Sequence, residues 1–188
     1  MLMAVFFTSD LHLGHKNIIS MCNRKFNTVD EMDEYIINRW NAKVNPEDEV
    51  YILGDLSYRS SVSVKTYLKK MHGRLKLIVG NHDHMWIKNV ENLYDYFELV
   101  SNMELIQYED KYITLCHYPL MEWSMSNRKN SWLIHGHIHD NRSNDTFNYI
   151  KEHLPQALNA GVDINNFEPV TFEELEENNR RWYGRRNA

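Results

Sequence analysis

Residues 76–84 read KLIVGNHDH, a stretch that changes character at its middle. Residues 77–79 are apolar and two of them are β-branched, which is typical of a buried strand. After Gly80 come four consecutive side chains that can bind metal or transfer protons, Asn81, His82, Asp83 and His84. An apolar strand that leads directly into such side chains indicates a functional site at the carboxyl end of a buried sheet.

Two earlier apolar segments share this pattern, residues 3–9 (MAVFFTS) and residues 49–54 (EVYILG). Between the three strands, residues 28–44 carry apolar side chains at helical spacing, and residues 62–71 predict a second, shorter helix. Strands that are apolar throughout are typical of a parallel sheet covered on both faces. The first half of the chain therefore predicts alternating strands and helices around a parallel sheet.

The second half of the chain predicts four more strands, the first two forming a hairpin or lying side by side: residues 103–108, 111–117, 131–137 and 156–163. Thr171 and Glu174 have the spacing of a capping box, which predicts a C-terminal helix that runs to about Trp182. The expected fold is an α/β sandwich in which helices flank central β-sheets and functional loops follow the strand ends.

Composition limits the class of protein. The 188 residues predict a single domain over residues 1–188, and 43% hydrophobic with 25% charged residues is ordinary for a globular protein. A net charge of −5 disfavours binding to extended nucleic acid, although a short nucleotide fits. Cys22 and Cys116 are far apart and predict reduced thiols. No signal peptide and no apolar run of about 18 residues is found, so we expect a cytoplasmic protein without a membrane partner.

Polar residues that can bind metal or transfer protons follow each predicted core strand. A single histidine after a strand is usually a packed or solvated residue. Here the pattern recurs after five separate strands, in the residues Asp10 and His12, Asp55, Asn81 to Asp83, His117, and His137 with His139. Because the carboxyl ends of parallel strands meet at one edge of a sheet, we expect these side chains to converge.

The chemistry of this set favours metal ions. Carboxylate and amide oxygens combined with imidazole nitrogens suit Mn²⁺, Fe, Ni²⁺ or Zn²⁺, and no thiolate belongs to the set. The ligands are too many for one tetrahedral site but suit two ions that share a bridging carboxylate. Two ions roughly 3.5–4 Å apart can stabilise the attacking and leaving oxygens of a phosphoryl displacement.

These residues form an ordered series of motifs: D-x-H (Asp10, His12), G-D (Asp55), G-N-H-D (residues 80–83), a lone His117, and G-H-x-H (His137, His139). In this order the series resembles the calcineurin-like metallophosphoesterase superfamily. The segments HLGHKNII, CNRKF, YILGDL and NAGVDINNFEPVTFEEL further resemble a compact bacterial and phage branch of predicted phosphoesterases.

The resemblance implies a role for each motif residue. It implies two divalent ions, with Mn²⁺ favoured, the first bound by Asp10, His12 and His139, the second by Asn81, His117 and His137, and both by Asp55. A hydroxide held between the ions would then attack phosphorus. The resemblance places His82 at the phosphate as the general acid for the leaving oxygen. Asp83 is expected either to orient His82 or to serve the turn.

Two residues are candidates for substrate binding. Arg24, in CNRKF, is expected to bind phosphate oxygens, the alternative being a solvated loop charge. Tyr118 lies in a long aromatic segment, residues 117–132, which forms either a wall that stacks on a base or a loop that packs on its own domain. His15, His84 and His135 lie near the motifs and receive no assigned role.

The leading functional hypothesis is a phosphodiesterase that acts on a small, nucleotide-like phosphate ester by metal-hydroxide attack. A phosphomonoesterase of the same fold is the alternative, because the motifs do not separate the two activities. A scaffold module that binds metal without catalysis is a third hypothesis, disfavoured because every ligand and the general acid are present. The sequence predicts no particular oligomeric state.

Overall fold

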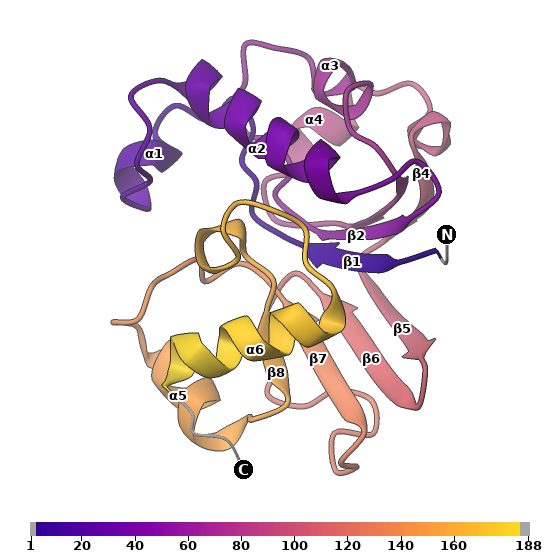
Figure 1. Ribbon diagram of the computed structural model, residues 1–188, viewed down its shortest axis with the longest axis vertical. Helices are drawn as coiled ribbons and strands as arrows, with labels where there is room; N and C mark the ends of the chain where they lie inside the picture. Colours follow the sequence, from indigo (N-terminus) through magenta and orange to yellow (C-terminus); the bar gives the residue numbers. More distant parts are fainter. Residues whose placement is uncertain (1–2, 185–188) are drawn as a thin grey trace.

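The computed structural model describes residues 3–184, which form two four-stranded β-sheets packed face to face (Figure 1). The strands of the first sheet are parallel and adjacent in chain order, β1 (Val5–Thr8), β2 (Glu49–Leu53), β3 (Arg74–Ile78) and β4 (Phe97–Ser101). The second sheet contains β5 (Met103–Tyr108), β6 (Lys111–Cys116), β7 (Ser131–His135) and β8 (Ala157–Asn159). Only β5 runs antiparallel to its neighbour β6, as the hairpin prediction requires.

The helices lie outside the sheets. Those beside the first sheet are α1 (Ile18–Met21), α2 (Val29–Lys43), α3 (Val64–Leu68), α4 (His84–Ile87) and the 3₁₀ turn η1 (Leu93–Asp95). Those beside the second sheet are α5 (Asp145–His153) and α6 (Phe172–Tyr183). The 3₁₀ turn η2 (Val162–Ile164) follows β8, and its Val162 packs in the core of the first sheet. Across residues 3–184, no helix combines the length and apolarity needed to cross a membrane.

Successive side chains of β1 and β2 pack on opposite faces of the sheet, and this explains why these strands are apolar throughout. In β1, Phe6 faces the helices of the first layer, whereas Phe7 packs between the two sheets. In β2, Ile52 faces the same helices and Leu53 faces the second sheet. Successive side chains point to opposite faces and both faces are covered, so neither face selects polar residues. The predicted α/β sandwich is confirmed.

The two long predicted helices both begin at a capping threonine, and the cap of the second was predicted. Thr28 accepts a hydrogen bond from the Glu31 amide at the start of α2. At the start of α6, Thr171 and Glu174 form the predicted capping box. Helix α6 contacts β1 and β8, which are edge strands, and thereby covers one side of the sandwich.

The structure differs from the sequence prediction in both halves of the chain; in the first half, the short helices α1 and α4 were not predicted. Strand β7 ends at His135 and β8 at Asn159, earlier than the apolar pattern suggested, because the chain turns there into the loops described below. Strand β4 and helix α5 were not predicted. Strand β4 buries only Phe97, and α5 buries only Phe147 and Ile150, so neither has a strong apolar pattern.

Candidate metal centre

The predicted ligands meet where the two sheets come together. Asp10 and His12 follow β1, Asp55 follows β2, and Asn81 follows β3, so the first sheet provides four of them. The second sheet provides the other three, His117 after β6 and His137 with His139 after β7. Backbone hydrogen bonds join these loops, for example Asp10 N to Gly54 O at 3.0 Å and Gly136 N to His117 O at 2.9 Å.

The backbone is strained at most of these positions. Positive φ angles occur at five of the predicted ligands: 57° at Asp10, 54° at His12, 55° at Asp55, 72° at His137 and 49° at His139. The left-handed region costs a side-chain-bearing residue of order 1–2 kcal/mol, so the surrounding structure must impose it. Such residues gather at functional sites, where side chains must point in directions that a regular strand does not allow.

Two glycines permit the loops to approach one another. Gly54 has φ of +83°, and a Cβ there would lie 2.5 Å from His117 Nδ1 and 2.6 Å from the Gly80 Cα. A Cβ on Gly136 would lie 2.5 Å from an Asp10 carboxylate oxygen. Any side chain at these positions would push the predicted ligands apart, so space requires glycine at both, and at Gly54 the positive φ requires it as well.

One group of ligand atoms joins Asp10, His12 and His139, all within 4.8 Å of one another. The His12 side chain is 1% exposed, and neither of its ring nitrogens has a hydrogen-bond partner among the described residues. Burial, reinforced by nearby positive groups, lowers the pKa of His12 far below its ordinary value, so the ring is neutral and carries a free lone pair. An unpaired buried imidazole nitrogen is costly unless a ligand such as a metal ion uses it.

A second group surrounds Asn81, whose Oδ1 lies 2.9 Å from His117 Nε2 and 3.0 Å from His137 Nδ1. His117 Nδ1 lies 2.8 Å from the Leu53 carbonyl oxygen, so Nδ1 carries the proton and the Nε2 of a neutral ring is an acceptor. This acceptor faces the Asn81 oxygen. Two acceptors at such a distance repel each other unless the imidazole is protonated or a cation binds there.

Asp55 lies between the two groups. Its Oδ2 is 3.6 Å from His12 Nε2 and also 3.6 Å from His117 Nε2. Burial raises the pKa of Asp55, and Asp10 adds to the rise while His117 opposes it. A buried carboxyl with a second carboxylate beside it gains most from a nearby cation, so the oxygen and nitrogen donors of this centre fit divalent metal ions.

His82 stands at the open side of the centre with its side chain 34% exposed. Its ring centroid lies 4.0 Å from that of Tyr58 and 5.5 Å from that of His12. Its backbone amide donates to Asp55 Oδ1 at 2.8 Å, which fixes the loop beside the predicted bridging carboxylate. Sequence reasoning missed Tyr58, because a tyrosine inside a serine-rich loop carries no motif.

The expectation that Asp83 orients His82 requires correction. Within residues 3–184 the Asp83 carboxylate accepts hydrogen bonds from four other groups: the amides of Asp55, Leu56 and Gly80, and the Trp86 indole. Its exposure is 0%, and none of these donors is on the His82 ring. Asp83 therefore serves the turn, the other role considered for it, and ties the loop after β3 to the loop after β2.

Arg24 also differs from its expected role. Its guanidinium is buried, donates to Asp163 at 2.8 Å and 3.2 Å, and donates to the carbonyl oxygens of Asp10 and Leu11 at 2.8 Å. Because these acceptors occupy its donors, the guanidinium supports the loop that carries Asp10, in place of the expected phosphate contact. The carboxylate of Asp163 in turn accepts from His139 Nδ1 at 2.8 Å.

Asp163 is the main residue that sequence reasoning missed. It lies four residues after β8, in η2, so it follows a strand end as the predicted ligands do. Its bond to Nδ1 leaves His139 Nε2 directed toward the metal centre, 3.8 Å from Asp10 Oδ1. Burial opposes protonation of His139, but the Asp10 and Asp163 carboxylates outweigh it and raise the pKa of His139. Metal binding there would therefore release a proton.

The remaining candidate residues, Tyr118 and three histidines, differ in their position relative to the metal centre. Tyr118 is 44% exposed, and its ring contacts His137 with centroids 4.8 Å apart, so it lies beside the centre. His15 packs against Tyr58, His135 is fully buried in β7, and His84 is exposed at the start of α4. These three histidines therefore occupy three different environments.

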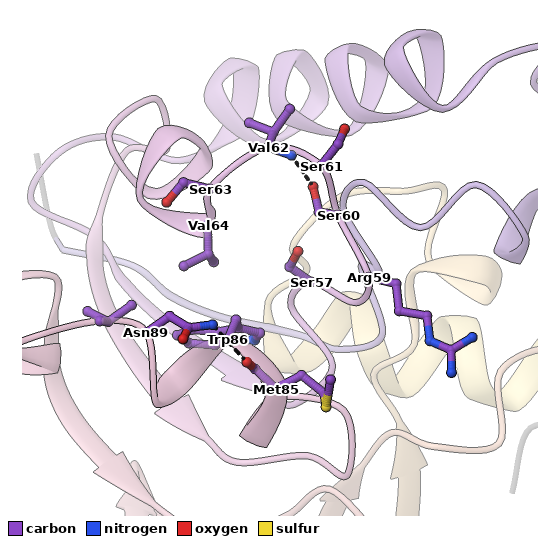
Figure 2. A pocket seen from close by; sticks show the side chains of 11 residues that line it. Ser57, Arg59, Ser60, Ser61, Val62, Ser63, Val64, Met85, Trp86 and Asn89 are labelled. Carbon is purple, nitrogen blue, oxygen red and sulfur yellow. Dashed lines mark hydrogen bonds between the residues drawn. The ribbon is translucent and has the colours of Figure 1, made fainter.

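Of two cavities considered for substrate binding, one adjoins the centre. A cleft of about 910 Å³, called the Lys25 cleft below, is lined by residues 18, 21–25, 137–141, 144, 146, 163 and 167. A second cavity of about 460 Å³ lies between residues 57–64 and α4 (Figure 2), and no predicted metal ligand lines it. Figure 2 shows the Arg59 side chain directed away from the other side chains of that cavity. The Lys25 cleft is therefore the one that opens onto predicted ligands, His137 and His139.

Comparisons with known proteins agree with this geometry. The family model for calcineurin-like phosphoesterases matches residues 3–183. An uncharacterized protein of Methanocaldococcus jannaschii is 31% identical over 171 residues, covering 90% of this chain and 87% of the relative. The gene 66 protein of Mycobacterium phage L5 is 32% identical over 158 residues, covering 71% and 76% respectively. A solved protein of unknown function from Aquifex aeolicus superposes with a TM-score of 0.71 at 28% identity, covering 94% of this chain and 99% of that one.

Proposed function

The chain belongs to the calcineurin-like phosphoesterase family, which implies metal-dependent hydrolysis of phosphate esters, and we propose that within this class it is a phosphodiesterase. Its substrate would be a small, nucleotide-like ester. The proposal rests on the metal centre described above and on the cleft beside it. A phosphomonoesterase remains the second candidate, because the same centre serves both reactions.

In this proposal the seven predicted ligands hold two divalent ions, Mn²⁺ being favoured. Asp10, His12 and His139 would hold one ion, Asn81, His117 and His137 the other, and Asp55 both. The position of Asp55 Oδ2, equally distant from His12 and His117, supports its bridging role. Bound there, the ions would lower the pKa of a water molecule and offset the negative charge of the phosphate.

His82 is proposed to donate a proton to the leaving oxygen. Its ring is partly exposed beside the predicted ligands, and contact with Tyr58 restricts its orientation. Burial, followed by the nearby His117, lowers the pKa of the free His82 ring, which disfavours the protonated form at neutral pH. An anionic phosphate next to the ring would favour the protonated form. Binding of the substrate would therefore promote protonation of His82, the proposed proton donor.

One observation carries the preference for a diester. After a monoester is cleaved, the phosphorus keeps no organic group, whereas a diester leaves one ester group attached. The Lys25 cleft, about 910 Å³, begins at His137 and His139 and is large enough for such a group. His82 and Tyr58 do not line it, so the leaving group and the retained group would lie on different sides. Tyr118 is proposed to contact the substrate from beside His137.

The test compares bis-p-nitrophenyl phosphate with p-nitrophenyl phosphate in the presence of Mn²⁺, Ni²⁺, Zn²⁺ or Mg²⁺. We expect kcat/KM to be at least about tenfold higher for the diester. A higher value for the monoester would instead identify a phosphomonoesterase. Failure to cleave either ester, with both ions present by elemental analysis, would favour the scaffold hypothesis. His82→Ala should keep its metal and lose about 10²–10⁴ in kcat, the range of general acid catalysis.

A further inference from the structure

In the Lys25 cleft, the acidic side chains have hydrogen-bond partners, but Lys25 has no acidic partner within residues 3–184. Its acidic side chains already have partners, since Asp140 accepts from Arg142 and the Trp182 indole, and Asp163 accepts from Arg24 and His139. Lys25 Nζ, in contrast, has only a neutral contact among the described residues, the Asn23 amide oxygen at 3.1 Å. The cleft therefore contains one cation whose charge no neighbouring carboxylate balances.

Three asparagines on the cleft add unused hydrogen-bond donors. The amide oxygen of Asn23 accepts from Lys25, that of Asn141 accepts from Ser143, and that of Asn144 accepts from the Phe147 amide at 2.7 Å. Each oxygen thus already has a partner within three residues along the chain. Within residues 3–184 the Nδ2 groups of Asn23, Asn141 and Asn144 donate no hydrogen bond. Side-chain amide donors gathered beside Lys25 suit a ligand that presents oxygens.

We propose that the Lys25 cleft binds a second anionic group, a phosphate carried by the retained part of the substrate. This inference rests on the proposed phosphodiesterase function and narrows its substrate class to phosphodiesters with an additional phosphate. The cleft starts at the predicted metal ligands His137 and His139, so a group attached to the scissile phosphorus extends into it. The positive charge of Lys25 would attract the second phosphate, and hydrogen bonds from the asparagine amides would orient it.

The experiment compares thymidine 3′-(p-nitrophenyl phosphate) with the same ester carrying a 5′-phosphate. In both compounds p-nitrophenol leaves, and the nucleoside stays on phosphorus. We expect the 5′-phosphate to lower KM about tenfold, as a hydrogen-bonded ion pair would, while kcat changes little. The advantage should shrink as ionic strength rises, because Lys25 is exposed.

Variants test whether Lys25 is the residue that lowers KM for the 5′-phosphorylated ester. Lys25→Gln should remove the advantage of the 5′-phosphate, and Lys25→Arg should restore it. Lys16→Gln, which removes an exposed charge outside the cleft, should preserve the advantage. All three variants should cleave bis-p-nitrophenyl phosphate as the parent does, because this ester has no second phosphate.

The outcomes separate this inference from the proposed function. Cleavage of both thymidine esters with equal KM, or an advantage that persists in Lys25→Gln, would overturn the anionic subsite and leave the phosphodiesterase intact. If no diester is cleaved although metal is bound, the proposed function fails and the subsite fails with it.

Discussion

Replacing Asp83 by asparagine should destabilise the fold as well as the metal centre. In the wild-type chain each carboxylate oxygen accepts two hydrogen bonds, Oδ2 from the Asp55 and Gly80 amides, and Oδ1 from the Leu56 amide and the Trp86 indole. The introduced side-chain amide would present an NH₂ group to one of these pairs of donors. Two hydrogen bonds to a charged acceptor would be lost, each worth about 1.5–3 kcal/mol.

The expected loss in the free energy of unfolding is therefore about 4 kcal/mol. For a chain of this length that corresponds to a melting temperature about 8–16 °C lower. The measurement is urea unfolding followed by circular dichroism, with both proteins held metal-free by a chelator so that lost ions do not contribute. Mn²⁺ affinity, measured separately by titration calorimetry, should also fall, because the Asp83 carboxylate positions the backbone of Asp55.

Asp48→Asn is the matched control. The Asp48 carboxylate is buried and accepts from the Ala4 and Asn45 amides, but it precedes β2, at the opposite end of the sheet from the metal centre. This variant should lose about 1.5–3 kcal/mol of stability and keep its Mn²⁺ affinity. The reasoning would be refuted if Asp83→Asn kept its stability within about 1 kcal/mol and lost only kcat. Asp83 would then act on His82, as the sequence first suggested.

Three further variants test other residues in or near the metal centre. Asp55→Asn should lose both ions, and elemental analysis showing full occupancy would exclude the bridging role. Asp163→Asn should bind Mn²⁺ about 10–100-fold more weakly, because His139 loses the partner that orients it; calorimetry on the folded variant checks this. Burial lowers the pKa of His135 from 6.5 to about 4. Between these pH values the unfolded state binds more protons than the folded state. The free energy of unfolding should therefore rise with pH across that window, by up to about 3 kcal/mol. His135→Gln should flatten this part of the metal-free stability profile, and an unchanged slope would contradict the assignment.

The strands and the convergence of the motif residues could be predicted because both depend on local pattern. An apolar run followed by a polar cluster indicates a strand end, and parallel strands bring their ends together. Strand β1, strand β2 and the capping box of α6 were found in this way. Strand β4 and helix α5 were missed because their weaker burial leaves little pattern in the sequence.

The environment of each polar side chain could not be predicted. Sequence reasoning treats a charged residue beside a motif as a candidate for substrate binding, and Arg24 met that description. Its partner Asp163 lies 139 positions away, so no local pattern pairs the two residues. Asp83 was linked to His82 by adjacency, although its hydrogen bonds lead to the loop after β2 and to α4. Contacts across the fold decided both cases.

The division of the predicted ligands between the two sheets has a consequence for the lifetime of the folded protein. Each proposed ion would take ligands from both halves of the chain, for example Asp10 with His139, and Asn81 with His117. The halves could then not separate until the ion dissociated, so metal binding would slow unfolding as well as stabilise the folded state. Proteases that attack opened chains would act more slowly on the loaded protein. The supply of metal would thereby govern turnover of the polypeptide itself.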